Sequence, residues 1–168
     1  PSTSGTTPLF PNVTVTPPAG NTVQSVTFTV TGVKDGANET LNINGQNIPL
    51  VAGTTVTTGT APDTVTYTVI DNGSGGLTVT VLDTKAPGFT GAQTETLIEG
   101  ATLSNKLVLP TAGTRDVMLS SVVNQDAGGT AAAPINPNIS STVNVNTVVT
   151  PFGTTPDVPT PPTVSTIQ

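Results

Sequence analysis

The sequence of 168 residues contains no cysteine and no histidine. These two absences remove the thiolate nucleophile, the usual general base and most of the side chains that bind transition metals. A carboxylate pair remains conceivable, but a glycosidase would hold it in an aromatic-lined cleft. With no tryptophan, one tyrosine and four phenylalanines, the chain has little material for such walls. We therefore expect a protein that is not an enzyme and has no small-molecule substrate.

Charged side chains are also scarce, at 8% of the residues. The four basic residues and the net charge of −6 leave no patch that could neutralise a nucleic-acid backbone. The sequence also lacks an apolar run near the ~18–20 residues that cross a bilayer. We expect neither nucleic acid nor membrane insertion.

Threonine, asparagine, serine, 17 glycines and 16 prolines fill the places of charged residues. This composition is typical of exported bacterial surface proteins and predicts an extracellular or cell-surface location. Because large aromatic rings are rare, the core must consist of valine, isoleucine and leucine, which favour β-strands.

The alternation of apolar and hydroxyl side chains predicts antiparallel strands. In residues 23–31, Val26, Phe28 and Val30 share one face and threonines share the other, which indicates a half-buried strand. Asn44-Gly45 lies between two apolar runs, the strongest local signal for a hairpin. Further strands are predicted at residues 54–58, 64–70, 77–82, 101–109, 115–124 and 139–149.

One segment breaks the β pattern, and it predicts a short helix over residues 90–99. Thr90 can cap its first turn with Gln93 in the capping-box position, Leu97 and Ile98 supply an apolar edge, and Gly100 ends it.

Proline and threonine dominate both ends of the chain. We interpret residues 1–20 as an extended Pro/Thr-rich segment or donor strand, residues 21–150 as a β-sandwich domain, and residues 151–168 as a Pro/Thr-rich linker of polyproline type.

Residues 23–149 contain the stretches VTFTVTGVKDGANETLNINGQNIPL, TVTYTVIDNGSGGLTVTVL, PTAGTRDVMLSSVVNQDAGG and STVNVNTVV. Together they resemble the repeated Ig-like or cadherin-like modules of giant bacterial cell-surface adhesins. The resemblance implies an all-β fold, an Ig-like or cadherin-like antiparallel β-sandwich, repeated head to tail. Such modules often end on an acidic Val-Asn-Asp linker that helps hold calcium, whereas this chain has Val145-Asn146-Thr147-Val148.

Calcium is the one cofactor that the residues suggest. Asp35, Asp71 and Asp126 follow predicted strands, where sandwich modules can hold calcium through hard oxygen ligands. None of them belongs to a DxDxDG run. The alternative is that each carboxylate stabilises its own turn, in which case the chain has no cofactor.

The composition, the strands and the ends together favour a non-catalytic structural module, a spacer or building block in a head-to-tail array on a bacterial surface adhesin or fibre. Its partners would be copies of itself or neighbouring repeats. One alternative is a self-assembling filament subunit, in which Val13 and Val15, or Val164 and Ile167, add a strand to a neighbour's sheet. A second alternative is a carbohydrate-binding module.

Overall fold

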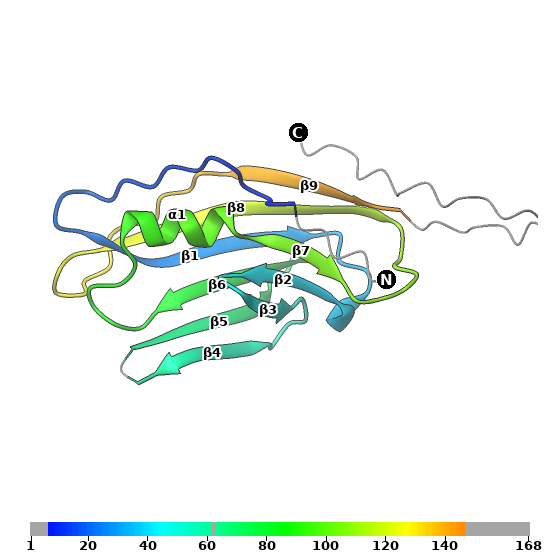
Figure 1. Ribbon diagram of the computed structural model, residues 1–168, viewed down its shortest axis with the longest axis horizontal. Coiled ribbons are helices and arrows are strands. Elements are labelled where there is room, and N and C mark those ends of the chain that lie inside the picture. The colour runs from blue at the N-terminus through cyan, green and yellow to red at the C-terminus, as the bar shows by residue number, and fades with distance from the viewer. Residues whose placement is uncertain (1–6, 62, 147–168) are drawn as a thin grey trace, which may run out of the picture.

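A computed structural model describes residues 7–61 and 63–146. Within them the elements, in chain order, are β1 Thr22–Thr31, the 3-10 turn η1 Gly36–Asn38, β2 Glu39–Ile43, β3 Gln46–Pro49, β4 Thr55–Thr60, β5 Asp63–Asp71, β6 Gly76–Asp83, α1 Gly91–Glu99, β7 Thr102–Asn105, β8 Gly113–Gln125 and β9 Ile139–Val145 (Figure 1).

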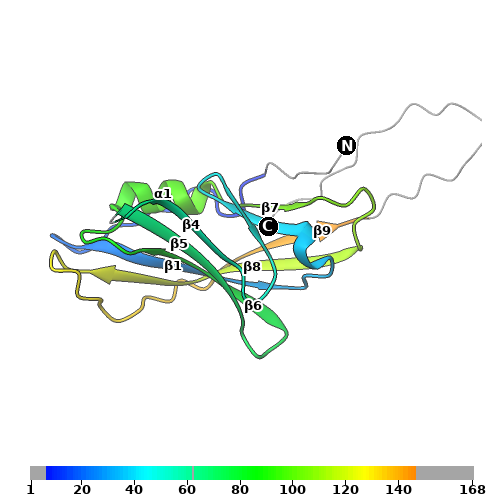
Figure 2. The same ribbon diagram turned by 90° about the horizontal axis from the view of Figure 1, so that it is seen from below.

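The strands form two sheets. The larger has the order β4-β5-β6-β1-β8-β9 and the smaller the order β3-β2-β7, and neighbouring strands in both are antiparallel. Figure 2 shows α1 and β7 on the same side of β1 and β8. The predicted all-β antiparallel sandwich with one short helix is thereby confirmed.

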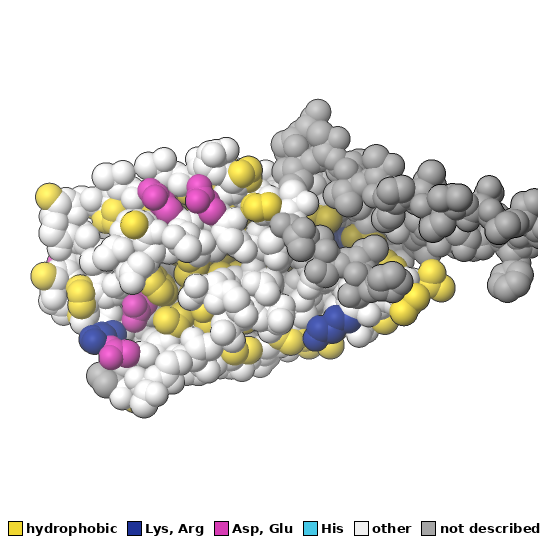
Figure 3. Space-filling view, viewed as in Figure 1, with side chains coloured by type: hydrophobic (Ala, Val, Ile, Leu, Met, Phe, Trp, Pro, Cys, Tyr) yellow, Lys and Arg dark blue, Asp and Glu magenta, His cyan; other side chains and the backbone are white. Residues whose placement is uncertain are grey.

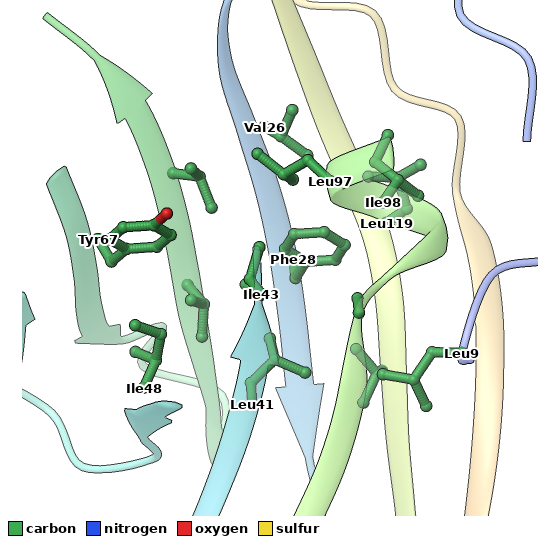
Figure 4. Close-up of a cluster of buried hydrophobic side chains, with 14 of the residues drawn as sticks. Leu9, Val26, Phe28, Leu41, Ile43, Ile48, Tyr67, Leu97, Ile98 and Leu119 are labelled. Carbon is green, nitrogen blue, oxygen red and sulfur yellow. The ribbon is translucent and has the colours of Figure 1, made fainter. Parts of the chain in front are cut away.

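Strand β1 lies near the middle of the larger sheet, between β6 and β8. Its period-two pattern holds, since Val26, Phe28 and Val30 are fully buried while the threonines between them are only partly so. The smaller sheet and α1 form the second layer, and their side chains complete the core. Leu41 and Ile43 lie beside Phe28, and Leu97 and Ile98 lie over β1 and β8 (Figure 4).

Two local predictions are confirmed at the level of the backbone. Asn44 and Gly45 have φ of 51° and 75°, the positive values that a two-residue type I′ hairpin needs between β2 and β3. Thr90 caps α1 in a complete capping box with Gln93. In the described part of the chain, no helix has the length and apolar character needed to cross a membrane.

The segment before β1 packs against the rest of the domain. We call residues 7–17 the N-terminal strap. It bends at residues 9–12, then continues without a turn to residue 17, and Leu9 N donates to Ala101 O at 2.9 Å. Leu9 and Phe10 are buried, and the Phe10 ring stacks on Phe28 with 5.7 Å between centroids. The described part of this segment thus contributes to the core, and it turns at residues 11–12 before it continues to β1.

One strand is shorter than predicted. The run 101–109 forms β7 only as far as Asn105, because the Asn105 side chain accepts from the backbone N–H of Leu107 at 2.9 Å and turns the chain. Val108 and Leu109 are consequently exposed. The predicted linker, residues 151–168, lies outside the described residues.

Candidate functional site: a buried ion cluster and an edge cleft

Arg115 in β8 is buried inside the sandwich, although its charge suggests a surface position. Side chains of a β-strand point alternately to its two faces. Arg115, Val117 and Leu119 occupy every second position of β8, so all three point inward. The guanidinium is well supplied with acceptors, because Nη1 donates to Gly113 O at 3.1 Å and Nη2 to Thr111 O at 2.9 Å.

Glu39 in β2 is the buried counter-ion. It has the same phase as Leu41 and Ile43, and it therefore points from the smaller sheet into the interior. Its Oε1 accepts from Arg115 Nε at 2.9 Å and also from Arg115 Nη2. This pair links β2 in one sheet to β8 in the other.

Asp35 completes the group from the loop between β1 and β2. Its Oδ2 lies 3.5 Å from Arg115 Nη2 and accepts from Asn105 Nδ2 at 2.7 Å and from the backbone N–H of Thr111 at 2.9 Å. Thr111 Oγ1 donates to the other oxygen. The hydrogen bonds from Thr111 and Asn105, with the nearby Arg115 charge, hold the pKa of Asp35 below its ordinary value, against the opposing effect of desolvation.

We call Asp35, Glu39, Asn105, Thr111 and Arg115 the ion cluster. It joins both sheets and two loops, with the Arg115 and Glu39 side chains fully buried and Asp35 at the edge of the cluster. Buried ion pairs add little net stability, because desolvation offsets their attraction, but removing one partner is costly. Loss of Arg115 or Glu39 alone is therefore expected to be costly.

The two other calcium candidates lie in separate turns. Asp71 accepts from Gly73 N at 2.7 Å, and Asp126 accepts from the backbone N–H groups of Gly128 and Thr130, at 2.9 Å each. The Asp126 hydrogen bonds, chiefly that from Thr130, lower its pKa against the opposing effect of desolvation. No group of three or more acidic residues that could hold a metal ion occurs among the described residues.

The first two assembly candidates, Val13 and Val15, lie on the strap and pack partly buried against the chain's own core. The backbone N–H of Val15 donates to Glu95 Oε1 of α1 at 2.7 Å. The other two, Val164 and Ile167, lie outside the described residues.

A cleft of about 170 Å³ opens between the strap and the segment that leads into β9. We call it the edge cleft. Aliphatic side chains of α1 and β8 and two half-exposed isoleucines make it apolar, and none of its lining residues is charged. The lining comprises Val13, Thr14, Val15, Thr16, Pro17, Ile98, Leu119, Val122, Asn124, Ile135, Pro137 and Ile139.

Few charges reach the outer surface. On the face in Figure 3 the acidic and basic side chains are scattered rather than gathered into a patch. Lys85 pairs with Asp63 at the surface, and Lys34 Nζ donates to Ala112 O at 2.9 Å.

Comparisons with protein-family models, curated proteins and solved structures found no match for this chain.

Proposed function

We propose that this chain is a non-catalytic, load-bearing module of an extracellular bacterial adhesin or fibre, joined to further copies or neighbouring repeats head to tail. The observation that carries the proposal is the arrangement of the strands that take up tension once the strap has been pulled away from the domain. β1 is the first described strand and β9 the last, and both pair with β8.

The pairing places the two attachment points at opposite ends of β8. Thr22, at the start of β1, is opposite Gln125, whereas Val145, at the end of β9, is opposite Gly113. Tension applied through Thr22 and Val145 therefore pulls along the strands.

Antiparallel hydrogen bonds lie across the strands, so tension along β1 and β9 loads many of them together instead of one after another. The β1–β8 ladder has nine residue pairs and the β8–β9 ladder has seven. The β1–β8 register shifts at two irregularities, and the bonds of each continuous stretch share the load, which raises the barrier to forced unfolding.

The ion cluster supports this load path. Arg115 lies near the start of β8, opposite Val143 of β9, at the end of the sheet where tension would leave. Its pairing with Glu39 ties the smaller sheet to the loaded strands. Relative sliding of the sheets would have to separate this buried pair.

Stretching the chain between handles at residues 21 and 146 tests the mechanical part of the proposal. This span should unfold in one step and release about 400 Å, from its 126 residues at ~3.6 Å each less the ~44 Å length of the 13-residue β8. Gradual lengthening at low force, without discrete steps, would contradict it.

Antibodies against the folded chain test the location. On intact cells of the source organism they should label the outer surface. Labelling that requires permeabilised cells would refute the extracellular assignment without bearing on the load path.

A further inference from the structure

The strap leaves one of its backbone edges unpaired within the described residues. Val15 directs its N–H to Glu95 and its carbonyl toward Gly91, where an added Cβ would lie 2.5 Å from that oxygen, so both groups face α1. In an extended chain the backbone groups of successive residues point to opposite edges. Thr14 and Thr16 therefore present their donors and acceptors on the edge away from α1, and both residues are exposed.

The edge cleft lies beside this strap. Ile135 and Ile139 line it from the larger sheet and remain 55% and 45% exposed, respectively. The cleft volume of about 170 Å³ is close to that of a cavity that holds one benzene-sized group, and so it has room for an aliphatic side chain or two.

We propose that this edge is a lateral pairing surface for a second copy of the same chain. The straps of two copies add to each other as antiparallel strands across a twofold axis. Thr14 of one copy lies opposite Thr16 of the other, and each of these pairs exchanges two backbone hydrogen bonds. The two Val15 residues face each other at the axis, as a pair without hydrogen bonds.

The chemistry of the strap suits a partner identical to itself. Identical strands in antiparallel register are self-complementary, as a twofold interface requires. Residues 12–16 are uncharged, so the straps of two copies do not repel each other. Pro11 and Pro17 have no backbone N–H and therefore limit the segment that can pair.

The apolar surface beside the strap is complementary as well. Directly opposed side chains in a strand pair point to the same face. Val13 and Val15 of the second copy therefore lie on the inner side, where they cover Ile135 and Ile139 and exclude water from the mouth of the edge cleft.

A single contact of this kind is weak. A pairing of about five residues per chain buries far less than the ~1,000 Å² expected of a stable interface. Many such contacts between neighbouring fibres would add through multivalency, and this consequence rests on the proposed head-to-tail array. The pairing itself does not, so it can be tested with isolated chains.

Because the chain has no cysteine, a single substitution gives a specific trap. In the proposed register the Val15 Cα atoms lie about 4.5 Å apart, within the range that a disulfide spans. Full-length Val15→Cys protein is equilibrated in a glutathione redox buffer, and the fraction of disulfide-linked dimer is measured. The matched control is Val56→Cys, a partly buried valine on the outermost strand β4. Melting curves verify that both variants fold.

We expect an equilibrium constant for the Val15→Cys dimer at least tenfold above that of Val56→Cys.

In sedimentation at high concentration, Ile139→Lys should abolish the self-association of the otherwise native chain, whereas Ile70→Lys, at a residue 57% exposed on β5, should leave it intact. Equal trapping of both cysteine variants, preferential trapping through Val56→Cys, or a chain that stays monomeric in sedimentation would each overturn the pairing. None of these results bears on the unfolding force of a single module.

Discussion

Replacing Arg115 by methionine should lower the free energy of unfolding by about 3–5 kcal/mol, the cost of leaving a buried charge without its partner. Glu39 Oε1 would lose two donors from the guanidinium, and its Oε2 is already buried without a hydrogen-bond partner in the described structure. Methionine cannot replace either contact. In a domain of this size the loss corresponds to a fall in melting temperature of roughly 10–20 °C.

Removing both charges should cost less than removing Arg115 alone. In Glu39→Leu/Arg115→Met no unpaired charge remains at this pair, and Asp35 keeps its donors from Asn105 and Thr111. A double-mutant cycle by chemical denaturation should therefore show strong non-additivity, with the second substitution recovering much of the loss caused by the first.

The exposed pair of Lys85 and Asp63 provides the control. Lys85→Met should cost no more than about 1 kcal/mol, because water and salt screen surface ion pairs. The account of the ion cluster would be refuted if Arg115→Met cost no more than Lys85→Met, or if the effects of the Glu39 and Arg115 substitutions simply added.

Two further perturbations have defined outcomes. The lowered pKa of Asp35 means that its contribution to stability is complete above about pH 4, the ordinary carboxyl value, and is lost as the pH falls through the folded-state pKa. Denaturation midpoints of Asp35→Asn should therefore fall less below pH 4 than those of the native chain, and parallel curves would contradict this. Gly91→Ala places a Cβ 2.5 Å from Val15 O, so it should displace the strap, speed protease cleavage within residues 7–20 and lower the melting temperature, because Leu9 and Phe10 belong to the core. Unchanged cleavage would show that the strap tolerates the clash.

The sequence predicted the local structure well. Period-two alternation placed Val26 and Phe28 in the core, Asn44-Gly45 specified its hairpin, and Thr90 marked the start of the helix. These features depend on neighbours within a few residues, which a single sequence displays directly.

The ion cluster was missed, although part of its signal was present. The same alternation that buries Leu41 also places Glu39 inward, and Arg115 shares the phase of Val117. What the sequence could not show is that these two charges meet across the sandwich, 76 residues apart. That contact depends on how the sheets pack.

The strap illustrates the same limit. Its alternating valines suggested a strand that could join a neighbour's sheet, but the sequence did not reveal that Leu9 and Phe10 enter the chain's own core. Asn105 ended β7 early through side-chain hydrogen bonds, which residue propensities do not encode.

The direction dependence of forced unfolding tests the load path most directly. Handles at Asn21→Cys and Asn146→Cys load the β1–β8 and β8–β9 ladders along the strands, whereas handles at Asn21→Cys and Ala127→Cys pull β1 and β8 apart from one end. At the same pulling speed, the first pair should require a several-fold higher unfolding force. Equal forces, or a higher force for the second pair, would contradict the account.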